Sequence, residues 1–291
     1  MALATRRTFR LSLTVALSLV CGYAFQLQIP YIVPMFAILL TAKPAPPPSP
    51  IKLITLLVGV SGILGVGMLL IPWMEFYPFA AVMVVGLGIF GSFCLSLLKG
   101  NEALGHFLAT GLVLVTVAGS VSSVISLVVI ESMVLGVGFA VLCQWVVYPF
   151  FSEDAHPADE ELQHASLKLT GLWPAMRSTA IVMPTYLVVL TNPGLYLPLA
   201  LKSIALGQQG SLLEMRNSGR DLLGATILGG ILAVLFWWLL GLAVNLWMFF
   251  LWALAFLTFF SAKIYGVLKS RFSASFWQSV ATTLVILLGA A

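Results

Sequence analysis

The chain is a series of apolar segments separated by short polar or proline-rich breaks. Nine segments approach the length of about 20 mostly apolar residues that crosses a hydrocarbon core of about 30 Å. Two further segments are apolar but short. The eleven segments lie near residues 11–28, 30–42, 53–71, 76–98, 103–120, 122–149, 173–191, 194–206, 219–240, 245–264 and 275–291. The pattern predicts an all-α, polytopic transmembrane helix bundle with about 11 membrane segments.

The composition indicates a lipid environment rather than a soluble fold. Hydrophobic residues make up 60% of the chain and charged residues 8%, whereas a soluble domain carries roughly 25% charged residues. The 14 Lys and Arg residues are scattered singly between apolar runs, so the net positive charge does not indicate nucleic-acid binding. Cys21, Cys94 and Cys143 lie inside apolar segments, and we interpret them as small core residues.

One orientation explains the distribution of basic residues. A cytoplasmic N-terminus, with both short segments crossing the membrane, places the Lys and Arg residues in or beside cytoplasmic segments or at the cytoplasmic ends of helices. The outer loops then carry only Glu75. Such an excess of Lys and Arg on the cytoplasmic side is the usual rule of membrane topology. We therefore expect a multi-pass protein of a bacterial inner membrane.

The two halves of the chain repeat the same order of segments. Each half has a long helix, a short proline-marked second helix, a helix rich in small residues, and then further long helices. Six crossings separate equivalent positions, so the pattern predicts two parallel pseudo-repeats. Matching positions are 164 to 172 residues apart: Pro34 with Pro198, Arg10 with Arg177, Lys99 with Lys269, Thr110 with Thr282, and Gly59-Val60-Ser61 with Gly224-Ala225-Thr226.

The repeat predicts three parts of the chain. The first transmembrane repeat, of six helices, occupies residues 1–150, and the second, of five helices, occupies 172–291. Residues 151–171 are expected to form an acidic cytoplasmic linker, since this stretch holds half of the 10 acidic residues. The chain ends where the sixth helix of the second half would begin, so we expect either eleven crossings or a C-terminal helix outside this chain.

Three stretches carry a resemblance to a known family. They are Arg10 at the start of an Ala/Leu-rich helix, Ile29-Pro30-Tyr31-Ile32-Val33-Pro34, and Arg220-Asp221-Leu222-Leu223-Gly224-Ala225-Thr226 followed by Gly229 and Gly230. With nearly the whole chain, they resemble the fusaric acid resistance or aromatic acid exporter superfamily, nearest to its short branch without a large cytoplasmic domain. The resemblance implies proton-gradient-driven efflux of small aromatic or amphipathic organic acids. It also implies a periplasmic adaptor (membrane fusion) protein as partner.

Two other functions stay open beside the exporter. One is a passive organic-anion channel, which would need no buried titratable group for coupling, and the other is a non-transporting membrane subunit or an enzyme acting on lipid. The sequence has no His-Glu-x-x-His, Gly-x-Ser-x-Gly or Walker motif and no clustered His/Cys ligands. We therefore expect no enzyme, no catalytic residues, no metal and no cofactor. The expected partners are a small organic anion and the lipid bilayer, without nucleic acid; a homo-oligomer is left open.

The proline breaks before the two short segments are candidate substrate sites. A helix of about 12 residues rises only about 18 Å, so its ends lie at membrane depth, buried in protein or lining a water-filled cavity. Paired interrupted segments mark the substrate site of many transporters, because helix N-termini attract anions. Alternatively, the prolines only shape tight extracellular turns. The candidate substrate-binding residues at these breaks are Pro30, Tyr31, Pro34, Asn192, Pro193, Tyr196 and Pro198.

Lys202 and Arg220 are the candidate cations for an anionic substrate, with Arg177 beside them. A guanidinium group can hold a carboxylate through two parallel hydrogen bonds. The alternative is that all three are topology anchors whose side chains reach the lipid headgroups.

Glu131 is the candidate proton-coupling residue, because it is the acid deep inside a long apolar segment. An ionised carboxylate at this depth is costly, so we expect it to be protonated, paired or exposed to a water-filled cavity. The alternative is a neutral glutamic acid hydrogen-bonded at a helix interface. His106 is the second candidate, with a structural histidine at an interface as its alternative.

The predicted linker gives a test of the topology. Protease added from the cytoplasmic face of membrane vesicles should cut the chain between Ser152 and Lys168, because this stretch is charged and too short to form a domain of its own. The cleavage products would be measured by mass spectrometry. Cutting from the periplasmic face alone would contradict the orientation.

Overall fold

The predicted all-α bundle is confirmed by the computed structural model, which describes residues 3–42, 46–98, 102–152, 172–207 and 212–289. These residues form helices and turns, with no strand among them. Residues 153–171 of the predicted linker lie outside the described part. The helices are α1 (Leu3–Ala24), α2 (Ile32–Thr41), α3 (Pro50–Leu69), α4 (Ile71–Phe76), α5 (Pro78–Phe93), η1 (Cys94–Leu98), α6 (Glu102–Val121), α7 (Ser123–Val147), η2 (Tyr148–Phe150), α9 (Trp173–Thr191), α10 (Pro193–Gly207), α11 (Leu212–Leu240), α12 (Leu246–Ile264) and α13 (Ala274–Gly289).

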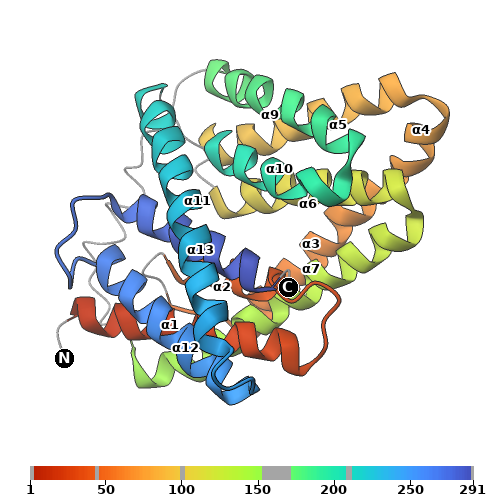
Figure 1. Cartoon of the computed structure of the whole chain (residues 1–291). Coiled ribbons are helices and arrows are strands. Elements are labelled where there is room, and N and C mark those ends of the chain that lie inside the picture. The colour runs from red at the N-terminus through yellow and green to blue at the C-terminus, as the bar shows by residue number, and fades with distance from the viewer. Residues whose placement is uncertain (1–2, 43–45, 99–101, 153–171, 208–211, 290–291) are drawn as a thin grey trace. The chain divides into compact units, whose positions relative to one another are not determined.

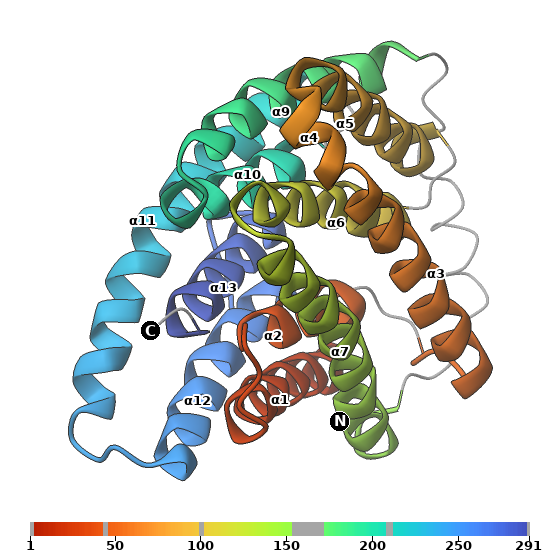
Figure 2. The ribbon, with the colours of Figure 1, turned by 90° about the vertical axis from the view of Figure 1, so that its right-hand side faces the viewer.

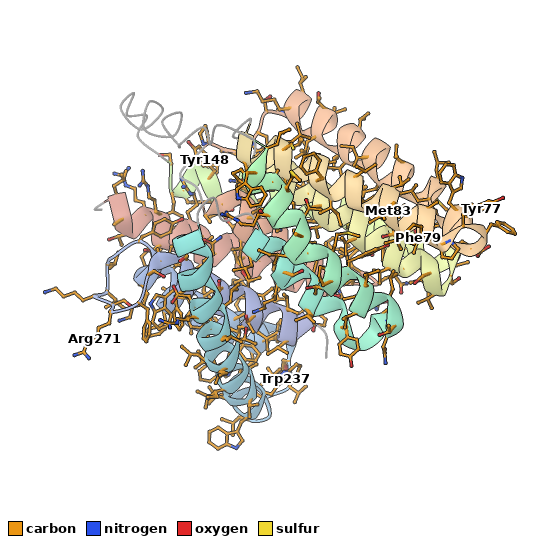
Figure 3. All side chains as sticks on the ribbon, turned by 90° about the horizontal axis from the view of Figure 1, so that it is seen from above. Tyr77, Phe79, Met83, Tyr148, Trp237 and Arg271 are labelled. Atoms are coloured by element: carbon orange, nitrogen blue, oxygen red, sulfur yellow. The ribbon has the colours of Figure 1, made fainter. Side chains whose placement is uncertain are left out.

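Six helical stretches in the described residues are long and apolar enough to cross a membrane: Pro50–Phe76, Pro78–Leu97, Leu104–Val121, Ser123–Phe150, Gly219–Leu240 and Leu246–Ile264. The apolar stretches through α3 and α11 are each only 22% buried. Large apolar side chains such as Phe79 and Met83 project outward from α5 (Figure 3). Exposed apolar surface of this extent is unfavourable in water and favourable in lipid. The chain is therefore a multi-pass membrane protein.

Two helix boundaries differ from the sequence prediction. Helix α1 begins at Leu3 rather than near residue 11, so Arg6, Arg7 and Arg10 belong to the helix itself. Arginine is a good helix former, so these residues can be helical. The prediction was based on apolar residues alone and therefore left out the stretch that contains the three arginines. Helix α10 extends over 15 residues and begins directly at Pro193, a residue that suits the first turn of a helix because its missing N–H is not needed there.

The chain divides into two compact units that each combine segments from both halves of the sequence. Unit 1 comprises Met1–Thr55, Ser132–Asp154 and Arg220–Ala291, and unit 2 comprises Leu56–Glu131 and Ala155–Gly219. The divisions fall within α3, α7 and α11, so each of these helices contributes to both units. The two compact units therefore do not coincide with the predicted parts 1–150 and 172–291. Each predicted part is one continuous stretch of sequence, whereas each unit combines separate stretches.

In unit 1, two helices from each end of the chain pack together. Helix α1 lies against α2 and α12, and α13 lies against α12 and α2 (Figure 2). Aromatic rings pack between α1 and α12: the centres of the Tyr23 and Phe249 rings are 5.2 Å apart, and the rings meet edge to face. At the C-terminal end of α12, the Tyr265 hydroxyl donates a hydrogen bond to the Ala42 carbonyl at 3.1 Å. Helix α12 and the end of α2 are thereby joined.

In unit 2, helices from the middle of the chain surround a buried core. Helix α5 lies against α6 and α9, and α10 lies against α9 and α6 (Figure 1). The core includes Val85, Ile89 and Phe93, which are fully buried. The buried Tyr186 hydroxyl of α9 donates a hydrogen bond to the Thr116 hydroxyl of α6 at 3.1 Å. This polar contact fixes α9 against α6 inside an otherwise apolar core.

The contact between α6 and the end of α5 depends on a glycine. A Cβ atom on Gly105 would lie 2.6 Å from the Ser92 carbonyl oxygen and 2.6 Å from the Ser96 Cβ. The facing segment, Cys94–Leu98, is a π-helical turn, in which one extra residue widens the helix. Only a residue without a side chain allows the two backbones to approach so closely.

Replacing Gly105 by alanine should therefore destabilise the protein, although alanine is normally preferred in a helix by about 1 kcal/mol. Crowding in a packed core costs about 1–3 kcal/mol, so the net effect should lower the midpoint of thermal unfolding in detergent. Gly91→Ala is the matched control, because a Cβ on Gly91 of α5 meets no atom within 4 Å. Gly91→Ala should leave the midpoint unchanged or raise it, and equal midpoints for the two variants would contradict the packing argument.

Candidate substrate and coupling site

The first proline break is a tightly packed turn. Helix α1 ends at Ala24 and α2 begins at Ile32, and a Cβ on Gly22 would lie 2.8 Å from the Pro30 carbonyl oxygen. Tyr31 is half-buried and Pro34 is buried. Helix α2 has no side-chain hydrogen bond at its N-terminal cap. The predicted residues Pro30, Tyr31 and Pro34 thus occupy one packed corner of unit 1.

The C-terminal end of α13 closes this corner. The Tyr23 hydroxyl of α1 donates a hydrogen bond to the Leu288 carbonyl of α13, and Gly289 lies so close to Tyr31 that a larger residue would overlap it. The first break is therefore covered by protein from the far end of the sequence.

The second proline break is shorter and lies in unit 2. A single residue, the exposed Asn192, separates α9 from α10. Its carbonyl accepts the backbone N–H of Tyr196 at 3.1 Å, and the partly buried Tyr196 packs against the core of unit 2. Pro193 begins α10. The side chain of Pro198 lies outside the described residues, so its predicted role stays a prediction.

The predicted cations are distributed over both units. Lys202 is half-buried in α10 of unit 2, together with the half-buried Arg177 of α9. Arg220 is exposed and belongs to unit 1. Its neighbour Asp221 accepts a hydrogen bond from the Ser273 hydroxyl at 2.7 Å, which connects α11 to the residues before α13. Of these three cations, only Lys202 lies on the short helix α10.

The two candidate coupling residues have different surroundings. His106 is partly buried in α6, a helix that packs against α10 in unit 2. Glu131 is exposed on α7, eight residues after Ser123 and hence about 12 Å along the helix axis. A carboxyl group on an apolar membrane helix is expected to face a water-filled cavity or a polar partner.

The structure reveals one buried cation whose environment the sequence did not indicate. Arg10 is 1% exposed and is the largest fully buried side chain among the described residues. Its guanidinium carbon lies 5.9 Å from the centre of the Tyr148 ring, within the range of a cation–π contact. The sequence placed Arg10 among the basic residues of the cytoplasmic side; its match with Arg177 in the repeat was the signal that could have singled it out.

Two apolar hollows lie among the described residues of unit 1. A pocket of about 250 Å³ is lined by Tyr23, Trp237, Leu240, Val244, Asn245, Leu246 and Phe249. A groove of about 550 Å³ is lined by Thr226, Ile227, Gly230, Ile231, Ala233, Val234, Trp237 and Leu287. Trp237 of α11 belongs to both (Figure 3). Neither lining includes a charged side chain or a predicted site residue, so these hollows suit apolar groups and not an anion.

Comparison with known proteins gives one match. Residues 7–147 match a family model described as "Protein of unknown function (DUF2955)". No curated protein and no solved structure matches the chain. The matched segment extends from α1 to the end of α7, and the likeness to this family therefore concerns the first of the two predicted repeats.

Proposed function

We propose that this chain is a secondary exporter of small aromatic or other amphipathic organic acids, driven by the proton gradient across a bacterial inner membrane. The observation that carries the proposal is a packing pattern that occurs once in each unit. If α1, α2, α5 and α6 correspond to α9, α10, α12 and α13, each main contact of unit 1 has its counterpart in unit 2. Each unit then takes two helices from one half and two from the other.

A pair of hydrogen bonds follows the same correspondence. In unit 1 a tyrosine of α1, Tyr23, bonds to Leu288 of α13. In unit 2 a tyrosine of α9, Tyr186, bonds to Thr116 of α6. Thr116 and Leu288 are 172 residues apart, the same offset as other matching positions of the repeat. Internal repeats built in this way are common among secondary transporters, which alternate between two states of similar energy.

The family likeness supports the same class of protein. The DUF2955 family is in the aromatic acid exporter-like group of membrane proteins. Since the sequence has no nucleotide-binding lysine loop, uphill transport by this chain has to draw on an ion gradient. A carboxylic acid is a suitable substrate because the half-buried Lys202 of α10 and the arginines of α1 and α9 offer cations inside apolar helices.

Flux measurements in proteoliposomes test this function. Purified protein should move benzoate or a related aromatic acid against its concentration gradient when a pH gradient is imposed. Transport should fall to downhill equilibration when the pH gradient is dissipated with a protonophore. Flux that does not respond to the pH gradient would favour the anion channel, and the absence of any flux would contradict transport by the chain alone.

Glu131→Gln tests the coupling role. The amide keeps the shape and hydrogen-bonding capacity of the side chain but cannot release a proton, so uphill export should fall at least tenfold. Membrane insertion should be normal, and exchange of substrate at equal concentrations on both sides should survive, because that step moves no net protons. Glu75→Gln is the matched control, since Glu75 is also described and not buried. Full pH-driven export by Glu131→Gln would contradict the coupling role of Glu131 and move that role to His106.

A further inference from the structure

Two of the three cysteines of the chain lie side by side in unit 1, although 122 residues separate them in the sequence. Cys21 lies near the C-terminal end of α1, and Cys143 lies near that of α7. Their Sγ atoms are 4.0 Å apart, with the Cys143 thiol donating to the Cys21 sulfur. Both are free thiols in the structure. The interpretation of the cysteines as small core residues therefore leaves out a contact between two reactive groups.

Aromatic contacts hold α1 and α7 together on both sides of the cysteine pair. The Phe9 and Phe151 rings stack with their centres 5.9 Å apart, and the centres of the Phe25 and Phe139 rings are 4.9 Å apart. Along the sequence, each cysteine lies between the two phenylalanines of its own segment, and the two segments run in opposite directions. The short distance between the sulfur atoms thus belongs to an extended antiparallel contact.

The two thiols differ in accessibility. Cys21 is partly buried, whereas Cys143 is only 4% exposed. A small oxidant that dissolves in the membrane can therefore reach the Cys21 sulfur, while the shielded Cys143 thiol is placed to react with the product. An accessible cysteine beside a second, resolving cysteine is the usual arrangement for reversible disulfide formation.

We propose that Cys21 and Cys143 form a redox-sensitive disulfide that joins α1 to α7 when an organic hydroperoxide enters the membrane. The Cys21 sulfur attacks the hydroperoxide: an S–O bond forms, the O–O bond breaks, and the thiol proton leaves with the alcohol. The Cys143 sulfur then attacks the Cys21 sulfenic acid: an S–S bond forms, the S–O bond breaks, and the hydroxyl group leaves as water with the Cys143 proton. The two sulfur atoms together lose two electrons, which the hydroperoxide accepts.

The disulfide would restrain two helices that carry candidate site residues. Gly22, next to Cys21, packs against Pro30 at the first proline break, and α7 carries Glu131, the candidate coupling residue. The sulfur atoms of a disulfide are about 2.05 Å apart, so its formation draws the two segments together and holds them there. Since secondary transporters alternate between two states, such a link should slow transport. This consequence rests on the proposed function, whereas the disulfide itself does not.

Counting the free thiols of the full chain tests the disulfide. Purified protein in detergent is treated with tert-butyl hydroperoxide, unfolded in SDS with N-ethylmaleimide, digested and analysed by mass spectrometry. Before oxidation all three cysteines should carry the label. After oxidation only Cys94 of unit 2 should carry it, and the peptides of Cys21 and Cys143 should be linked, with a mass two hydrogen atoms below their sum. Dithiothreitol should restore both labels. Labels that persist on Cys21 and Cys143, or oxygen added to either sulfur without a link, would overturn the proposal.

Single substitutions provide the matched controls. Cys143→Ala and Cys21→Ala each remove one sulfur of the pair, so hydroperoxide should give no linked peptide in either variant. Cys94→Ala should form the link as wild type does, because Cys94 is also partly buried but belongs to unit 2. All three replace a cysteine by a small apolar residue, and their elution in size-exclusion chromatography should match that of wild type. A linked peptide that contains Cys94 would overturn the assignment.

Transport in proteoliposomes separates the consequence from the proposed function. Export of benzoate by wild-type protein should fall at least tenfold when the disulfide forms and should recover with dithiothreitol. Cys143→Ala should export benzoate equally with and without hydroperoxide. Unchanged export by the linked protein would overturn the control of transport by the disulfide. If reduced wild-type protein shows no flux but the linked peptide forms, the exporter function fails and the disulfide stands.

Discussion

The hydrocarbon core offers no water to the backbone, and this absence determines the structure. Every N–H and C=O group within it has to find a partner inside the protein, which in a chain without strands means a helix. The hydroxyl side chains obey the same constraint: those of Thr55, Ser178 and Thr258 donate to the carbonyl one turn earlier in their own helix. With polar groups satisfied locally, the outer faces of α3 and α11 are left to apolar side chains that face lipid.

Because lipid tails are as apolar as leucine, association of the helices requires more than apolar surface. Close packing and a few interhelical hydrogen bonds have to supply it. Both are found in each of the two units. Glycines allow close approach at Gly22, Gly105 and Gly289, and the hydroxyls of Tyr23 and Tyr186 reach across to α13 and α6. The exchange of helices between the halves thus depends on small residues and on two tyrosines.

The proposed function depends on polar groups that lie inside apolar helices. Arg10 is buried, and a neutral apolar side chain in its place would fill the same space without the cost of desolvation. Two such residues belong to unit 2: Lys202 is half-buried in α10, and Glu131 is exposed on α7, where the first segment of the unit ends. In the proposed exporter, a shielded cation would bind the organic anion and a carboxyl group would couple its transport to protons.

The sequence by itself determined the helices, their approximate limits and the order of elements in each half. Spanning length and apolar composition are local properties of a segment, and lipid selects for them directly. The tertiary structure decided the surroundings of individual polar side chains. Arg10 and Arg6 look alike in the sequence, yet of the two only Arg10 is buried, with its guanidinium group over the ring of Tyr148, which is distant in the sequence. The first proline break was predicted to be either a substrate site or a tight turn, and only the tertiary structure shows that the end of α13 packs against it. Burial depends on which distant helix packs against a face, and no local pattern contains that information.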